Sequence, residues 1–321
     1  DALPILLKRI GQALIVLLLA YTLAFFLLSA LPSDGVAARY ADPALGLSQA
    51  EIDQIREQMG VDKPLLEQYF STLAGLFTGD LGYSVASGTP VAHLITDAAP
   101  HTFALAATSI GLAIVAALAT AYVATLPGSG PLRRAVRSLP SFMVSLPGFW
   151  IAILLLQFFS FRLGWVNVVD PSPLEGLILP TLTLAVPMAA PLMQVLIRSI
   201  DEVRDQPFVQ VVRARGASEA RIFWRDVLRN SLLPTITMAG LLFGELVGGA
   251  VVTETVFGRA GLGSLTVNAV SSRDMPVLLG VVLIAATAYV VINLIVDLLY
   301  PVLDVRLREA PAKTAVKENA R

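Results

Sequence analysis

The residues whose types and spacing could perform chemistry are few in this chain. It contains no cysteine, which excludes thiolate nucleophiles, thiolate metal ligands and disulfides. None of the four lysines follows a glycine, so the sequence holds no GxxxxGK(S/T) loop for binding phosphates. Neither an HExxH zinc motif nor a GxSxG nucleophile elbow occurs. The chain therefore has no P-loop with which to hydrolyse ATP, and we expect it to hold no cofactor of its own.

The two histidines are weak candidates for a site. His93 and His101 flank Pro100 without a set of ligand-spaced partners on a clear helix, so we expect no metal site. An enzyme active inside the membrane would need a nucleophile and a base. Only His101 could be a histidine base, and it lies at the end of an apolar segment, which argues against such an enzyme.

Glu245 is the more informative ionisable residue. It lies inside an apolar segment, 16 residues beyond Arg229, which corresponds to ~24 Å of helical rise. An ionisable residue at such depth in a membrane segment is a functional candidate by default. The same segment carries Gly240, Gly244 and Gly248, four residues apart, so one helix face is nearly bare backbone and suits close packing. Whether the neighbour on that face belongs to this chain or to another subunit stays open.

The amino-acid composition indicates that these apolar segments lie in a membrane. Hydrophobic residues make up 55% of the chain and charged residues only 15%, and the mean hydropathy is +0.72. A soluble domain has about a quarter of its residues charged. The sequence therefore indicates an integral membrane protein, and its net charge of -1 says little about partners because the charges are segregated along the chain.

The pattern predicts an all-α membrane protein with six transmembrane helices, each long enough for ~30 Å of hydrocarbon. The predicted spans lie at the end of 1–31 and at 101–126, 139–161, 174–197, 232–252 and 276–303 within a core of 100–304, and 305–321 is a polar tail. Prolines in the third and fourth spans predict bent helices around a path. A signal peptide is the alternative for the first segment, but signal cores are only about 7–15 residues long. Because the sequence begins on Asp1, we expect a few residues to precede it.

Residues 32–99 are polar and predict a small extramembrane lobe. Nine acids face three basic residues between Leu31 and Pro100. Ser48 and Glu51 have the spacing of a capping box, which predicts a helix from Ser48 to Met59, and 64–77 predicts a second, amphipathic helix.

The segment 200–230 is a polar, arginine-rich insertion between the fourth and fifth spans. Its apolar residues recur at helical spacing, which predicts amphipathic helices that lie against protein. Gly216 interrupts them as a left-handed helix end, and Ser218 is a good N-cap with Glu219 in the next first turn. The prediction is helix, sharp turn, helix. We expect the apolar face to need a partner, which argues against the alternative of a solvated charged linker.

The distribution of Lys and Arg predicts the orientation. Seventeen lie at the ends of spans on the side of the termini and the insertion, and six lie on the side of the lobe. Basic residues mark the cytoplasmic side. Both termini and the insertion are therefore predicted to be cytoplasmic.

The insertion resembles a known family pattern. VRARGASEARIFWRDVLRNSLLPTITMAG is similar to the cytoplasmic EAA loop in membrane subunits of binding-protein-dependent ATP-binding-cassette (ABC) importers. The residues that carry this match are Ala214, Gly216, Arg229, Asn230, Leu233 and Pro234. Gln210, Val211 and Val212 stand where the founding pattern has Glu-Ala-Ala, and peptide permeases are loose there.

Other segments resemble the peptide/nickel branch of that family. They are its outer loop at Ala250–Gly263 and Arg273–Pro276 and its ending at Asn293–Arg308, where Val305 replaces a usual proline. The lobe stretches Val61–Tyr69 and Gly79–Ser84 resemble the B-type subunit of dipeptide and oligopeptide permeases.

The resemblance implies a type I importer permease in the bacterial cytoplasmic (inner) membrane. Its implied partners are a second homologous permease, two cytoplasmic ATPase domains that bind ATP and Mg, and an extracytoplasmic substrate-binding protein. The implied cargo is a di- or oligopeptide, with nickel or another small solute as the alternative. Coupling to the ATPase would involve Arg213, Ala214, Arg215, Gly216, Ser218 and Glu219.

Two further hypotheses stay open at this point. Glu245 could line the translocation path and favour a cationic end of the cargo, or its carboxyl could be hydrogen-bonded to a neighbouring helix or wetted at the mouth. A stand-alone channel or secondary transporter is the functional rival. Such proteins often have internal repeats or several intramembrane charges, and the sequence shows no convincing example of either.

Overall fold

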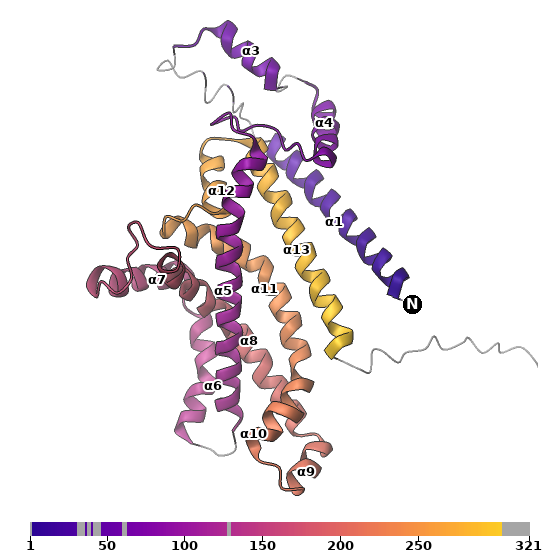
Figure 1. The fold of residues 1–321 in the computed structure, drawn as a ribbon, viewed down its shortest axis with the longest axis vertical. Helices are drawn as coiled ribbons and strands as arrows, with labels where there is room; N and C mark the ends of the chain where they lie inside the picture. The colour runs from indigo at the N-terminus through magenta and orange to yellow at the C-terminus, as the bar shows by residue number, and fades with distance from the viewer. Residues whose placement is uncertain are drawn as a thin grey trace, which may run out of the picture. The chain divides into compact units, whose positions relative to one another are not determined.

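The computed structural model describes residues 2–30, 36, 40, 46–59, 63–126 and 130–303. Their regular structure is helical apart from one isolated bridge between Tyr83 and Pro90 (Figure 1). The elements are α1 (Ala2–Ser29), α3 (Gln49–Met59), α4 (Leu65–Thr78), α5 (Val91–Thr125), α6 (Pro131–Val144), α7 (Gly148–Leu155), η2 (Leu156–Arg162), α8 (Glu175–Arg204), α9 (Pro207–Ala214), α10 (Glu219–Arg221), η3 (Ile222–Val227), α11 (Leu228–Val256), α12 (Leu262–Ser271) and α13 (Met275–Leu303). The predicted tail at 305–321 lies outside the described residues.

Five helices in the described part of the chain are long and apolar enough to cross a membrane. These candidate spans are Arg9–Ser29, Val91–Thr125, Glu175–Arg204, Glu219–Leu246 and Met275–Leu299. A sixth exists if α6 and the α7–η2 pair are one interrupted span.

The interruption falls inside the predicted span 139–161. Helix α6 ends at Val144, and Pro147 adopts extended backbone as the N-cap of α7. Proline disfavours helical geometry in the residue before it, here Leu146, which explains why the helix stops there. An apolar run of sufficient length predicts that a segment can cross hydrocarbon, but not that it does so as one straight helix.

The chain divides into two compact units. Unit 1 comprises Asp1–Leu112, Leu146–Pro187 and Phe243–Val291, and unit 2 comprises Ala113–Ser145, Met188–Leu242 and Ile292–Arg321.

The core of unit 1 packs α5 against α12 and α13. Val91 and Ile95 of α5 belong to one buried cluster with Leu262 of α12 and Val277 of α13. The helices approach closely because α13 presents Gly280 to α5. A Cβ atom there would lie 2.8 Å from both the Val91 and Ile95 side chains.

A buried carboxylate holds the start of α12. Glu254, in the last turn of α11, is fully buried and accepts hydrogen bonds from Thr102 Oγ1 at 2.6 Å and from the Gly263 N–H at 2.7 Å. Thr102 Oγ1 accepts in turn from the Leu262 N–H at 2.8 Å. The first N–H groups of a helix lack partners within the helix and carry partial positive charge. Glu254 therefore satisfies the α12 N-terminus and ties it to α5.

A second buried carboxylate holds a turn within the predicted lobe. Asp274, at the N-terminus of α13, accepts hydrogen bonds from Ser84 Oγ and from the Ala86 N–H. These bonds fix the turn around Gly88 to the start of α13.

The predicted capping box of the lobe is confirmed. Ser48 donates from its N–H and its hydroxyl to Glu51 Oε2 at 2.7 Å each, and the Glu51 N–H donates back to Ser48 Oγ at 3.4 Å. These hydrogen bonds lower the pKa of Glu51 from its ordinary value, because they favour the ionised carboxylate.

Gly263→Ala tests the packing around Glu254. The new Cβ would lie 2.5 Å from Val251 Cα and 2.8 Å from Glu254 Oε2, so backbone has to move. We expect destabilisation of about 1–3 kcal/mol, the usual cost of overpacking. The thermal unfolding midpoint of the detergent-purified chain should fall. Gly111→Ala is the matched control, since its Cβ meets nothing within 4 Å. Equal midpoints for the two variants would contradict this account.

Candidate functional site

The arginine-rich insertion forms a bent pair of short helices, here called the elbow and defined as residues 205–227. Helix α8 ends at Arg204, and α9 begins two residues after Asp205 with Pro207 at its first position. Proline suits that position because its fixed φ fits a helix start and its missing N–H is not needed there. Both arms of the elbow join long helices, α8 on one side and α11 on the other (Figure 1).

The turn between the two arms has the geometry that the sequence predicts. Gly216 has φ of 82°, in the left-handed region that favours glycine. Its N–H donates to the Arg213 carbonyl at 3.0 Å, and the Ala217 N–H donates to the Val212 carbonyl at 3.4 Å. This pair of bonds is the Schellman motif that closes many helices. Ser218 then caps the next helix by accepting from the Arg221 N–H at 3.3 Å.

Glu219 joins the two arms to the end of α8. Arg213 Nε of α9 donates to Glu219 Oε1 at 2.8 Å, and Arg204 Nη2 lies 3.5 Å from Glu219 Oε2. The Arg204 side chain is only 12% exposed, whereas that of Glu219 is 29% exposed. A charge held away from water needs an opposite charge close by. Glu219 thus serves two guanidinium groups, and the elbow is fixed to α8.

The apolar side of the elbow is covered by the chain itself. Val209, Ile222, Phe223 and Val227 are fully buried. Tyr122 of α5 meets Phe223 edge-on, with ring centroids 4.9 Å apart. The apolar face is covered, as expected, but the cover comes from within this chain: Tyr122 of α5 supplies part of it. Sequence spacing shows that a face is apolar but not which segment packs on it.

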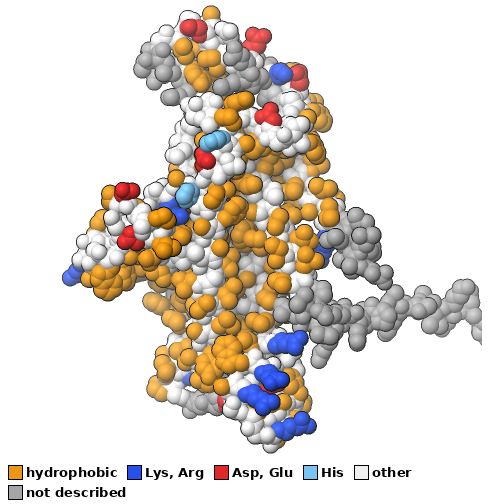
Figure 2. All heavy atoms as spheres, in the orientation of Figure 1, with side chains coloured by type: hydrophobic (Ala, Val, Ile, Leu, Met, Phe, Trp, Pro, Cys, Tyr) orange, Lys and Arg blue, Asp and Glu red, His pale blue; other side chains and the backbone are white. Residues whose placement is uncertain are grey.

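The outer side of the elbow is exposed and mixed in character. It presents Phe208 and Val211 among exposed arginines, together with Trp224, which is half exposed although its ring stacks on Tyr122 with centroids 5.9 Å apart. Lys and Arg side chains gather over α9 and α10 in Figure 2. Aromatic residues and arginine are enriched in the interfaces that proteins form with one another. This second face, rather than the buried one, is the surface available to a partner.

Two structural features, one in the elbow and one beside it, are not predicted by the sequence. The first is η3, a π-helical turn from Ile222 to Val227 that runs directly into α11. Such turns occur often at functional sites. The second is Ser231, fully buried, whose hydroxyl lies 3.0 Å from the Val227 carbonyl and 3.3 Å from the Ser199 carbonyl of α8. Residue type alone predicts neither of them, and the contact of Ser231 depends on how α8 and α11 meet.

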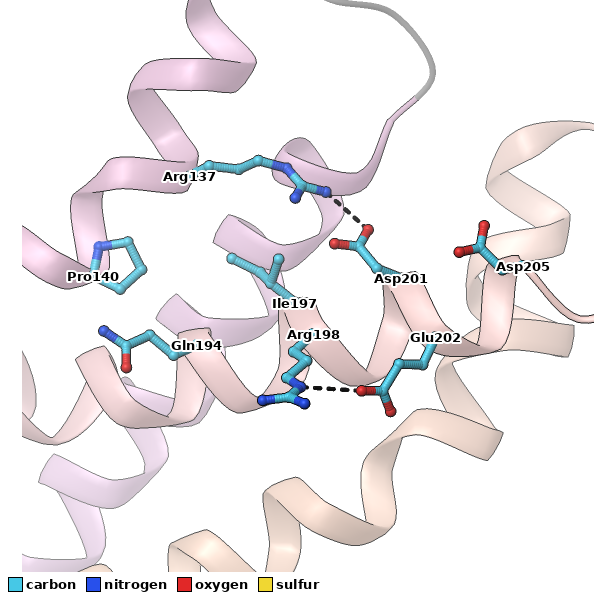
Figure 3. Close-up of a pocket in the computed structure, with 8 residues that line it drawn as sticks. All are labelled: Arg137, Pro140, Gln194, Ile197, Arg198, Asp201, Glu202 and Asp205. Carbon is cyan, nitrogen blue, oxygen red and sulfur yellow. Dashed lines mark hydrogen bonds and ion pairs between the residues drawn. The ribbon is translucent and has the colours of Figure 1, made fainter.

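An open cavity of about 380 Å³ lies beside α8, between it and α6 (Figure 3). Arg137 of α6 donates to Asp201 at 2.8 Å, and Arg198 donates to Glu202 at 3.0 Å. Arg137 also donates to the Ala124 carbonyl at the end of α5. Arg137 therefore connects α6 to both α5 and α8, whereas the Arg198–Glu202 pair lies within α8.

Helix α11 contains the three glycines predicted to pack against a neighbouring helix, and Glu245, predicted to line the path. A Cβ on Gly240 would lie 3.0 Å from Val296 and one on Gly244 would lie 3.4 Å from Tyr289, whereas one on Gly248 would meet nothing within 4 Å. Glu245 is exposed, and no hydrogen bond or ion pair joins its carboxylate to the described residues. The roles of these residues stay predictions.

Comparison with known families decides the identity. Residues 128–309 match the family described as binding-protein-dependent transport system inner membrane component, and residues 2–106 match the N-terminal part described for such components. The chain belongs to this family. This permease is therefore a multi-pass membrane component of a binding-protein-dependent transport system.

Curated relatives match this permease over nearly its whole length. A putative peptide transport system permease protein of Brucella abortus (strain 2308) is 34% identical over 95% of this chain and 98% of its own. The glutathione transport system permease protein GsiC of Pectobacterium atrosepticum is 35% identical over 94% and 97%. GsiC of Escherichia coli O6:H1 is 33% identical over 94% and 97%.

A solved structure confirms the predicted fold class. The chain aligns with a structure of the MetNI methionine ABC transporter in an inward-facing conformation with a TM-score of 0.55 and 19% identity. The alignment covers 66% of this chain and 96% of that one. This permease thus has the helical fold of a type I ABC importer membrane subunit.

Glu219→Gln tests the fixation of the elbow. Glutamine keeps the size of the side chain but removes the charge between Arg213 and the largely buried Arg204. A hydrogen bond to a charged group contributes about 1.5–3 kcal/mol, so we expect a looser elbow. In the assembled transporter, substrate uptake per ATP hydrolysed should fall several-fold.

The matched control is Glu202→Gln. It removes an exposed ion pair with Arg198 at i,i+4 spacing, which contributes little. If the two variants have the same uptake per ATP and the same unfolding midpoint, the elbow is not held by Glu219.

Proposed function

We propose that this permease is one of two membrane subunits of an ATP-driven importer for peptides. The assignment of peptides as the cargo rests on the similarity, over nearly the whole chain, to relatives named peptide or glutathione permeases. Glutathione is itself a small γ-linked peptide, so both names point to one chemical class. Similarity along the entire chain supports a shared cargo class better than one local motif would.

The elbow is the proposed point of attachment for the ATPase. Its exposed face offers Phe208, Val211 and Trp224, which suit a hydrophobic groove on a soluble partner, and arginines that suit an acidic rim. The coupling residues predicted from the sequence, Arg213 to Gly216 with Ser218 and Glu219, form the turn and its ion pairs. The ATPase would therefore bind an elbow whose shape is already fixed.

The proposed movement follows from the connections of the elbow. The first arm, α9, is joined to the end of α8 by a two-residue link, and Arg204 of α8 also contacts Glu219 of the elbow. The second arm continues through η3 directly into α11. Ser231 also connects the start of α11 to α8. A displacement of the elbow is thus passed to two candidate spans at once. Alternating access then arises when ATP-driven closure of two ATPases displaces two such elbows.

The assembly has the composition that this mechanism needs. It contains a second homologous permease, two cytoplasmic ATPase domains that bind ATP and Mg, and an extracytoplasmic binding protein that delivers the peptide. The excess of Lys and Arg on the side of both termini and the elbow supports a cytoplasmic position for all three. This chain contributes half of the path and no catalytic residue.

Reconstitution tests the proposal. The permease is purified with its partners, placed in liposomes, and given ATP inside and the binding protein with a peptide panel outside. We expect ATP-dependent uptake of di- or oligopeptides and peptide-stimulated ATPase activity. Liposomes that hold the permease alone should take up nothing. Uptake by the permease alone, or stimulation by nickel and not by any peptide, would overturn the proposal.

Glu245→Gln tests the predicted path. The carboxylate is exposed in this chain, so in the assembly it can face a cargo with a positively charged amino terminus. We expect uptake of a free dipeptide to fall about fivefold to tenfold, equivalent to roughly 1–1.4 kcal/mol. The N-acetylated form of the same dipeptide is the matched control and should lose nothing further. If the variant, expressed normally, transports the free dipeptide as well as the parent does, Glu245 has no such role.

A further inference from the structure

Helix α4 of the lobe is amphipathic with an unusually wide apolar side. At 100° per residue, its apolar residues cover an arc of about 180°, and the opposite arc carries Glu67, Gln68, Ser71 and Thr78. None of its residues is fully buried. The apolar arc is therefore wider than the part of the protein that packs on it.

One half of the apolar arc packs on the first and last candidate spans. Tyr69, Leu73 and Leu76 lie against the buried cluster of Tyr21 and Phe25 of α1 and Leu279 of α13. Tyr21 Oη donates to the Tyr69 carbonyl at 2.8 Å. These contacts fix the orientation of α4 about its own axis.

The other half of the apolar arc is bare. Leu66, Phe70 and Phe77 lie on adjoining positions of the helical wheel, and their side chains are 64%, 62% and 87% exposed. Water-exposed phenylalanines aligned along one helix are unfavourable unless something covers them. The occupant must be apolar along the length of α4.

The depth of α4 indicates which occupant this is. Tyr69 Oη lies 2.9 Å from Thr22 Oγ1, and the Tyr69 ring stacks on Phe26 with centroids 5.6 Å apart. Thr22 and Phe26 precede Ser29, the end of the first candidate span, by seven and three residues, or about 10 and 5 Å of helical rise. Tyr69 of α4 thus lies beside the last two turns of this span, and α4 stands next to the end of α1 (Figure 1).

Helix α1 also exposes apolar side chains near its contact with α4. Phe26 is itself partly exposed, and Leu23 and Leu27 of the same helix are exposed beside it. The span Arg9–Ser29 has 21 residues, about the length that crosses ~30 Å of hydrocarbon, so we expect its end near the boundary between acyl chains and headgroups. Aromatic residues concentrate at this boundary.

We propose that α4 is an interfacial membrane helix, whose Leu66, Phe70 and Phe77 insert into the acyl–headgroup boundary of the lipid leaflet on the lobe side. The polar arc with Ser71 faces water. In this arrangement the lobe is attached to the bilayer surface at a fixed height, through α4 and its contacts with α1, in addition to its covalent connections. The proposal is independent of the cargo and of the ATPase.

Site-directed spin labelling tests this proposal in the complete transporter in lipid nanodiscs. The chain has no cysteine, so Phe70→Cys and Phe77→Cys introduce single labelling sites in it, and Ser71→Cys on the polar arc is the matched control. A complex with the unmodified chain gives the background from partner subunits. The measurement is the collision rate of each nitroxide with oxygen, which partitions into lipid, and with a water-soluble nickel chelate.

We expect nitroxides at 70 and 77 to be accessible to oxygen and protected from nickel, and the nitroxide at 71 to show the reverse. Nickel access at 70 and 77 equal to that at 71 would show that water covers the face and would overturn the proposal. Protection from both reagents would show a protein partner on this face and would overturn it too. Leu66→Cys provides a third position on the same arc if a phenylalanine variant fails to assemble, and the unfolding midpoint of each variant reports its folding.

Discussion

A carboxylate that leaves water must be met by hydrogen-bond donors or a cation, and the ends of several helices in this permease are organised around that requirement. Glu254 receives the first N–H groups of α12 and the hydroxyl of Thr102. Asp274 receives the turn of the lobe at the start of α13. Glu219 lies between two guanidinium groups in the elbow. In hydrophobic surroundings, polar contacts of this kind specify where helix ends lie, because apolar packing alone allows sliding.

The elbow is locally rigid and is connected to two long helices, α8 and α11. Its turn is closed by backbone bonds at Gly216 and a side-chain cap at Ser218, which fix its shape without help from a partner. Its inner face is already packed under Tyr122, so a partner gains access only to the exposed side chains, which include Phe208, Val211 and the uncovered side of Trp224, whose ring also stacks on Tyr122. A preformed docking surface loses little conformational freedom on binding, which favours transmission of force over absorption of it. This is the physical basis of the proposed coupling to α8 and α11.

The predicted lobe is also held by a small number of specific contacts. Asp274 holds one part of it, and the aromatic contacts of Tyr69 hold another part against α1. An exposed apolar stripe on α4 is compatible with solubility only if lipid or protein covers it. A membrane surface at that depth provides such cover and needs no further subunit.

The sequence by itself determined the membrane class, the regions of the candidate spans, the turn at Gly216 and the cap at Ser218, because hydrophobic length and local backbone preferences are properties of short segments. It also indicated the protein family, because several motifs of that family occur in the expected order along the chain. Only the tertiary structure decided that the apolar face of the elbow is covered internally, that Glu254 bonds to Thr102 across 152 positions, and that α6 and α7 are separate helices. Each of these depends on which distant segment meets a residue, and periodicity within one segment carries no record of that.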